Sequence, residues 1–192
     1  MESGTDRTSI VGHRLPEWFR VRSPREILHR LANGDPLLLR ARAGSFLERH
    51  AYLLEGDALF LRTIAVIAHA GPRCRTAADA DAWIEARMHE AVQELLQEPV
   101  RYPSEGGVYE HIGRPLGLDP CAMRRVAARF NRLAEADRQA FFGLVIRGQR
   151  MEALAAQLGE SAPELGRRAR YVLDLFLDPA ATLTRPECVR EL

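Results

Sequence analysis

Apolar residues recur with a period close to 3.6 along most of the chain, which is typical of α-helices that bury one face. In the first half, the pattern predicts a short helix over 24–32, followed over 37–54 by one helix or by a pair broken near Gly44. The segment 58–70 is apolar on nearly all sides, so we expect it to be the most buried helix of this half. The segment 77–99 carries a long apolar stripe and is expected to be the longest helix.

Helix start signals support this division of the chain. Ser23 is followed directly by Pro24 and, three positions after the serine, by Glu26. These residues are an N-cap, a proline at the first helical position and the acid of a capping box. Asp119 and Pro120 repeat the cap and the proline before the next apolar stripe. We therefore expect a helix to begin after each cap.

The most informative pattern lies in residues 137–177. One apolar stripe in this segment is formed by Met151, Leu154, Ala155 and Leu158. Gly159 predicts the end of that helix, because glycine adopts the positive φ common at helix ends. Ser161 and Glu164 are spaced as a capping box, in which the hydroxyl and the carboxylate each bind a free backbone N–H. The pattern predicts a second helix immediately after a short turn.

The second of these helices has an apolar face and a largely basic face. The apolar face is expected to contain Leu165, Ala169, Val172 and Phe176. The opposite face is expected to carry Arg167, Arg170 and Asp174. A helix-turn-helix protein lays its second helix in the DNA major groove with outward side chains of this kind. We therefore predict a helix-turn-helix that binds DNA.

This segment resembles region 4 of the sigma-70 family of RNA polymerase sigma factors, especially the small extracytoplasmic-function type. The matching pieces follow Leu133 and are AEADRQAFFGLVIRGQRMEALAAQLG, a serine-led turn and the RRAR cluster at 167–170, about 45 residues in all. The resemblance implies an all-α fold and a role in transcription. It also implies recognition of a −35-like promoter element, with RNA polymerase core and an anti-sigma or other regulatory protein as partners.

The resemblance further implies which residues contact DNA. In the recognition helix and its cap these are Ser161, Arg167, Arg168 and Arg170. The arginines would bind phosphates and guanine. Arg147 and Arg150 lie in the preceding link, where their guanidinium groups would reach backbone phosphates.

The patterns divide the chain into five parts. Residues 1–22 are polar and without period, and we expect them to form a flexible arm. The helical domain over 23–99 would be a degenerate counterpart of sigma region 2, which binds polymerase and opens the −10 element. The density of glycine and proline predicts a linker over 100–120. The helix-turn-helix domain then covers 121–178, and a tail covers 179–192.

Composition limits any DNA-binding role to a local surface. The chain has 27 basic residues, all arginine, against 26 acidic residues, so its formal net charge is only +1. Such a balance excludes strong non-specific binding by the whole chain. Residues 121–177 hold ten arginines and six acids, a modest local excess of four. The near-neutral charge favours an alternative function, a sigma-derived helical module that binds another protein and has no promoter activity.

Other classes of function lack their sequence signals. The chain contains no P-loop, GxGxxG, GxSxG or HExxH motif, so we expect neither an enzyme nor a cofactor. Three cysteines lie far apart without a CxxC pair, which argues against a disulfide framework and a zinc ribbon. No stretch approaches the ~18 apolar residues of a membrane span, and no signal-peptide core is present. We expect a cytoplasmic protein with no membrane partner.

The six histidines are scattered along the chain. Glu85 and His89 share a helix face, and His69 lies five residues before Cys74. Neither spacing is a recognised metal-binding motif. The sequence therefore predicts no metal site.

Overall fold

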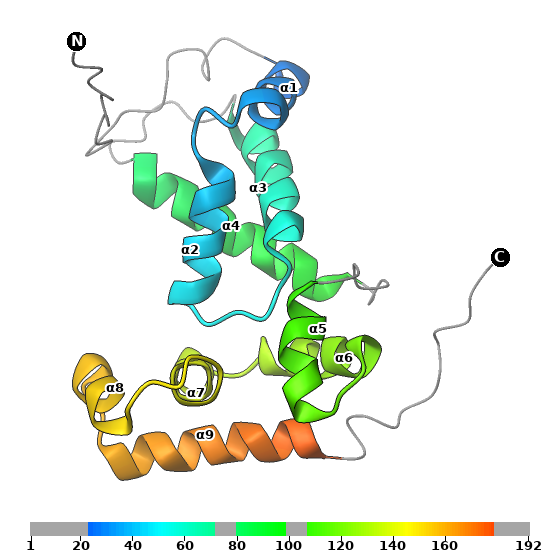
Figure 1. Cartoon of the computed structure of the whole chain (residues 1–192). Helices are drawn as coiled ribbons and strands as arrows, with labels where there is room; N and C mark the ends of the chain where they lie inside the picture. The colour runs from blue at the N-terminus through cyan, green and yellow to red at the C-terminus, as the bar shows by residue number, and fades with distance from the viewer. Residues whose placement is uncertain (1–22, 72–79, 99–106, 179–192) are drawn as a thin grey trace, which may run out of the picture.

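Two groups of helices make up the part of the chain that the structure describes, residues 23–71, 80–98 and 107–178. The structure is a computed structural model, and every regular element in these residues is helical (Figure 1), which confirms the all-α prediction. The first lobe contains α1 (Pro24–Gly34), α2 (Leu39–Arg49), α3 (Gly56–Ala70) and α4 (Ala80–Gln97). The second lobe contains α5 (Val108–Gly113), α6 (Pro120–Phe130), α7 (Glu135–Phe141), α8 (Met151–Leu158) and α9 (Ala162–Leu177).

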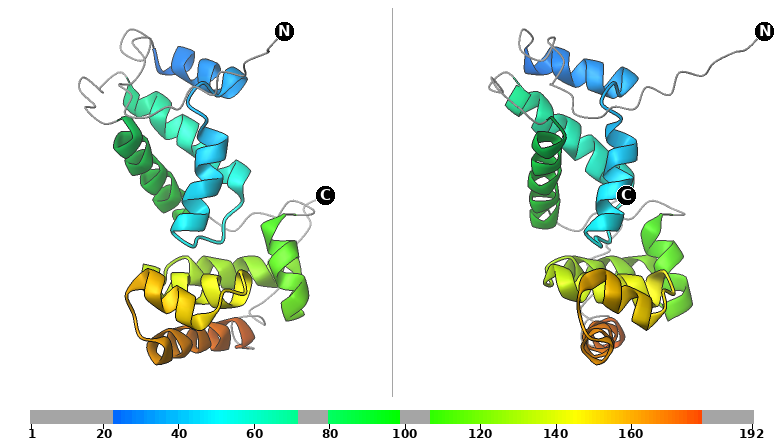
Figure 2. Two further views of the ribbon diagram at one scale, coloured as in Figure 1. Left: turned by 60° about the vertical axis from the view of Figure 1, so that its left-hand side comes forward. Right: turned by 90° about the vertical axis from the view of Figure 1, so that its left-hand side faces the viewer.

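The lobes are stacked, and α9 lies on the side of the second lobe farthest from the first (Figures 1 and 2). The lower ends of α2 and α4 face the second lobe, and α7 lies between α2 and α9 (Figure 1). The loop that joins α2 to α3, residues 50–55, lies at the contact between the lobes. We call it the 50–55 loop.

The long helices of the first lobe agree with the sequence pattern. The helix α4 has 18 residues and is the longest in the described ranges. The helix α3 buries seven of its residues, more than α1, α2 or α4, so it is the most buried helix of this lobe as expected. Its apolar residue Leu61 is nevertheless 60% exposed.

The prediction for 37–54 is corrected in detail. The helix α2 is a single helix that passes through Gly44 without a break and ends at Arg49. Residues 50–55 are not helical, and Ala51 adopts a φ of 52°. A positive φ is costly for a residue with a Cβ, so the chain turns at Ala51 under the constraint of its surroundings.

The caps predicted at Ser23 and Asp119 are confirmed. Ser23 and Glu26 form a complete capping box at the start of α1, with both side chains bound to backbone N–H groups. The Asp119 carboxylate accepts a hydrogen bond of 2.8 Å from the backbone N–H of Ala122 at the start of α6. Each cap satisfies donors that have no partner within the helix.

Each lobe has its own apolar core. The first core contains residues of α1 to α4, and Phe46 lies in it among Leu39, Leu59, Ile67, Ile84 and Met88. In the second core, the rings of Phe130, Phe141 and Phe176 pack together with centroids 4.7 to 5.8 Å apart. This core also contains Leu53 of the 50–55 loop, whose side chain is fully buried. The first lobe therefore contributes a residue to the core of the second.

The predicted linker, 100–120, includes structured residues. Val108 to Gly113 form the short helix α5. Tyr109 and Ile112 of α5 are buried in the second core against α6. The part of the linker from residue 107 onward thus belongs to the second lobe. Residues 99–106 lie outside the described ranges.

Some expectations concern residues outside the described ranges, namely the arm over 1–22, the tail over 179–192 and the helix start over 77–79. Cys74 and Cys188 also lie there, whereas Cys121 belongs to α6 and is described. Among the described helices, none combines the length and the apolar character that crossing a bilayer requires.

A substitution at Gly44 tests the continuity of α2. Gly44 lies inside the helix, and a Cβ added there would meet nothing within 4 Å. Alanine loses less backbone entropy than glycine on folding, so Gly44→Ala should raise the free energy of unfolding by about 0.5 to 1 kcal/mol. Urea denaturation followed by circular dichroism measures this change.

The matched control is Gly148→Ala, because a Cβ at Gly148 also meets nothing within 4 Å but its φ is +62°. There the left-handed backbone should make alanine destabilising by about 1 kcal/mol. Equal effects at both positions would contradict the helical assignment of Gly44.

Candidate nucleic-acid interface

The helices α8 and α9 lie at the residues where the sequence predicts a helix-turn-helix. After Leu158, Gly159 has a φ of 68°, the left-handed conformation expected at a helix end. Ser161 is the N-cap of α9, and its hydroxyl accepts a hydrogen bond of 3.4 Å from the Glu164 backbone N–H. The link between the helices is therefore residues 159–161, a length typical of helix-turn-helix motifs.

Gly143 allows α8 to pack closely against the preceding turn. Residues Phe142–Ile146 form a π-helical turn that continues α7. A Cβ at Gly143 would lie 2.5 Å from Cδ2 of Leu154, well inside van der Waals contact. Leu154 is instead buried beside Ala140 and Leu165 in a small third cluster. The missing side chain thus helps set the position of α8.

The two faces of α9 lie as the sequence predicts. The apolar face is buried through Leu165, Ala169, Val172 and Phe176. On the opposite face Arg170 and Asp174 are exposed, and the Arg167 side chain is 73% exposed. Tyr171 is also 57% exposed beside them. The sequence analysis did not select Tyr171, although its position next to Arg170 could have indicated it.

Glu164 is engaged differently from the prediction. Its carboxylate does not complete a capping box with Ser161 but accepts hydrogen bonds from Arg167 at 2.5 to 3.1 Å. These hydrogen bonds lower the pKa of Glu164 and raise the pKa of Arg167. Arg167 is one helical turn from Glu164, so its guanidinium competes with the backbone N–H of Ser161 for the Glu164 carboxylate oxygens. Arg167 is therefore exposed but already paired.

Arg168 faces the protein rather than the open side of α9. Its guanidinium lies 2.6 Å from Asp137, 3.3 Å from Glu160 and 3.2 Å from Glu164, and only 28% of its side chain is exposed. Asp137 belongs to α7, so the ion pair ties the start of α9 to that helix. Its position supports a bracing role more directly than the predicted contact with DNA.

The two arginines of the link differ in their surroundings. Arg147 forms an ion pair of 2.8 Å with Glu48 of α2, and its guanidinium carbon lies 5.2 Å from the Phe142 ring centroid. Arg147 therefore contacts the first lobe. Arg150 is the N-cap residue of α8 and is exposed. Of the predicted site residues, Arg150, Arg167 and Arg170 are thus exposed arginines, whereas Arg147 is paired with the first lobe.

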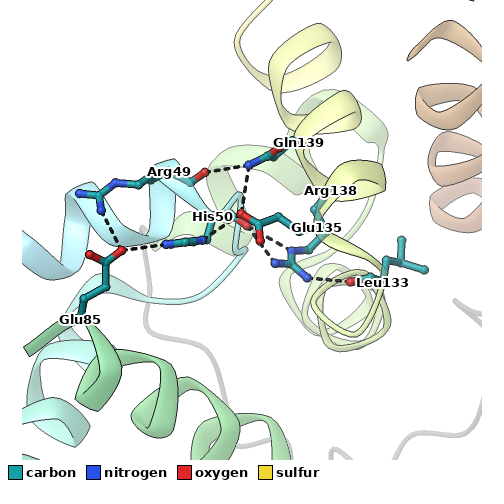
Figure 3. A network of polar contacts seen from close by, with 7 residues as sticks. All are labelled: Arg49, His50, Glu85, Leu133, Glu135, Arg138 and Gln139. Carbon is teal, nitrogen blue, oxygen red and sulfur yellow. Dashed lines mark hydrogen bonds and ion pairs between the residues drawn. The ribbon is translucent and has the colours of Figure 1, made fainter. Parts of the chain in front are cut away.

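The contact between the lobes centres on Arg138, which is only 5% exposed (Figure 3). Its Nε and Nη2 donate to the carbonyl oxygen of His50 at 3.2 and 3.1 Å, and its Nη1 donates to that of Leu133 at 2.6 Å. The guanidinium carbon also lies 4.1 Å from the Tyr52 ring centroid. A buried guanidinium is tolerated when its donors are paired in this way.

Asn131 makes a second buried contact between the lobes. Its side-chain oxygen accepts a hydrogen bond of 2.7 Å from the backbone N–H of Leu53, and its side-chain nitrogen donates to the Leu53 carbonyl at 2.9 Å. Gln139 adds a donor to the carbonyl of Arg49 at 3.3 Å. Side chains of the second lobe thus pair with backbone groups of Arg49, His50 and Leu53.

His50 lies between two carboxylates at the same contact (Figure 3). Its Nδ1 is 2.9 Å from Glu135 of α7, and its Nε2 is 3.3 Å from Glu85 of α4. Arg49 also donates to Glu85 at 2.8 Å. The resulting chain of polar contacts runs from α4 to α7 and crosses between the lobes.

Sequence analysis missed Arg138, Asn131 and His50 as parts of one contact. Their partners lie 78 to 88 residues away, so no local spacing indicates them. Arg138 itself was the one local indication, because a charged residue so close to the buried apolar residues Ala140 and Phe141 needs a partner.

Comparisons with protein-family models, with curated proteins and with solved structures found no match to this chain.

Replacement of Arg138 tests the contact between the lobes. Arg138→Leu would leave the partly buried carbonyl oxygens of His50 and Leu133 without this donor, and each lost partner costs about 1 to 3 kcal/mol. We expect the free energy of unfolding to fall by about 3 kcal/mol in urea denaturation. Arg129→Leu, at an exposed position of α6, is the matched control and should change it by no more than about 0.5 kcal/mol. Similar losses in both variants would contradict the role of Arg138.

Proposed function

We propose that this chain is a sigma-factor-like transcription protein that recognises a promoter element through α8 and α9. The observation that carries the proposal is the exposed face of α9, where Arg167, Arg170 and Tyr171 lie opposite the buried stripe. A recognition helix needs such a face, because its outward side chains must reach base edges and phosphates.

The accessible arginines take different roles in this proposal. Arg167 and Arg170 are the candidates for contacts in the major groove, where a guanidinium can bind guanine with two hydrogen bonds. Arg150, at the start of α8, is the candidate for a backbone phosphate. The Ser161 hydroxyl accepts from the Glu164 backbone, and its own hydrogen remains able to donate to a phosphate.

The pairing of Arg167 with Glu164 is compatible with DNA binding. Both side chains are at the surface, where ion pairs contribute little to stability. A phosphate can therefore replace the carboxylate at small cost. Arg168 remains with its three carboxylates and supports the site by holding α9 against α7.

The stacked lobes leave the recognition face open. The helix α9 lies on the far side of the second lobe, and its buried stripe points inward toward the second core (Figure 1). Its exposed face therefore points away from α1 to α4. DNA could reach this face without separation of the lobes, and RNA polymerase core is the partner that the sigma-like role requires.

A second candidate function is a sigma-derived module that binds a protein and has no promoter activity. Arg147, Arg167 and Arg168 are each paired with acidic side chains, which removes positive charge from the surface around α9. The exposed Tyr171 and Leu177 on the same helix would suit a protein partner, such as an anti-sigma or other regulatory protein.

A DNA-binding assay tests the first function. Double-stranded oligonucleotides are selected by the purified chain from a randomised library, and their affinities are measured by fluorescence anisotropy at several salt concentrations. Replacement of both Arg167 and Arg170 by alanine should weaken binding about 10- to 100-fold and reduce the salt dependence, because base and phosphate contacts are lost. Failure to enrich any sequence, or an equal loss with Arg129→Ala, would contradict DNA recognition by α9.

A polymerase pull-down separates the two functions. A sigma-like protein should bind RNA polymerase core and start transcription from a template that carries the selected element. The double variant should still bind core but lose initiation, because its substitutions affect only DNA contacts. Binding to a protein partner without any initiation by the unaltered chain would instead support the interaction module.

A further inference from the structure

Three potential metal ligands meet beside the contact between the lobes. His50 follows α2, and Glu85 and His89 lie one turn apart on α4. Each offers one ligand atom, and these atoms all lie within 4.8 Å of one another. The sequence analysis considered Glu85 with His89 but not His50, which is at least 35 residues away.

Neighbouring groups already hold His50 in position. Its carbonyl oxygen accepts two hydrogen bonds from the buried Arg138. Its ring lies 4.5 Å from the ring of Phe46 and 4.8 Å from that of His89. The Phe46 ring also packs against His89 at 4.7 Å. The two imidazoles are thus placed together by packing, which reduces the entropy lost when they bind an ion.

Both ring nitrogens of His50 lie beside carboxylate oxygens, an arrangement that suits a bound cation. A neutral imidazole carries one N–H, but both of its nitrogens face carboxylate oxygens, those of Glu135 and Glu85. When Nδ1 donates its proton to Glu135, Nε2 presents a lone pair toward Glu85. A metal ion between Nε2 and Glu85 would bind both of these ligand atoms. Ligating histidines commonly donate their other ring N–H to a carboxylate, and here Glu135 would accept that hydrogen bond.

We propose that His50, Glu85 and His89 bind a divalent transition-metal ion, with zinc as the best match. Two imidazole nitrogens and one carboxylate oxygen are a ligand set that zinc accepts, with a fourth position left for water. Zinc bonds of about 2 Å place tetrahedral ligand atoms roughly 3.3 Å apart, so the present spacing must close by no more than about 1.5 Å. Arg49 at Glu85 is the competing cation, and as a surface ion pair it can be displaced.

The ion would stabilise the stacked lobes. It would join the end of α2 to α4 and fix the ring that faces Glu135 of α7. The same residue, His50, supplies the carbonyl that binds Arg138. Metal binding and the contact between the lobes would therefore reinforce each other.

Calorimetric titration with zinc tests the site. The full chain is treated with a chelator, dialysed and titrated with ZnCl₂. We expect one equivalent of tight binding and a higher melting temperature with zinc. His89→Gln and Glu85→Gln, each checked for an unchanged far-ultraviolet spectrum, should weaken binding at least tenfold. His111→Gln, at an exposed position of α5, is the control and should bind as the unaltered chain does.

Cobalt substitution identifies the ligand atoms. The cobalt(II) complex should show visible bands of a four- or five-coordinate ion without the near-ultraviolet absorption of a thiolate ligand. A thiolate band, or zinc affinity that His89→Gln and Glu85→Gln leave unchanged, would overturn the proposal by placing the ion elsewhere. No binding at all would also overturn it.

Discussion

The burial of Arg138 is the constraint on which the arrangement of this protein depends. A guanidinium is always charged and carries five N–H donors, so its burial is tolerated only where carbonyl or carboxylate oxygens receive them. Two of the acceptor bonds go to His50, a residue of the other lobe. If the lobes separated, water could hydrate the Arg138 guanidinium. The His50 carbonyl, however, would lose its two hydrogen bonds from Arg138. Asn131 likewise makes two buried hydrogen bonds with the Leu53 backbone that separation of the lobes would break. The stacked lobes are therefore one unit.

This constraint extends to the candidate DNA-binding face. Arg138 belongs to α7, and α7 supplies both Phe141, which stacks on Phe176 of α9, and Asp137, which binds Arg168. The position of α9 is thus set by the same short helix that binds the first lobe. An ion at His50, Glu85 and His89 would act on this helix through Glu135. Direct contacts of α7 therefore link the contact between the lobes to α9.

The candidate site shows where local patterns succeed and where they fail. The exposure of Arg167 and Arg170 follows from helical periodicity, and the structure agrees with it. The engagement of Arg168 with Asp137 does not follow, because the pair joins residues 31 positions apart. Glu164 had two local partners, the cap and Arg167, and the hydrogen-bond geometry favoured the arginine. The same limit applies to His50, whose distant carboxylates become visible only in the folded chain.

The sequence by itself determined most of the helices, the caps at Ser23 and Asp119 and the buried stripe of α9, because these features depend on residues within one or two turns of one another. It also determined the short turn between α8 and α9, through Gly159 and Ser161. Only the tertiary structure decided that α2 continues through Gly44, that α5 joins the second core, and that the lobes are stacked. Those outcomes depend on packing and on hydrogen bonds between distant residues, such as Arg138 and His50, and on the cost of leaving buried polar groups unpaired.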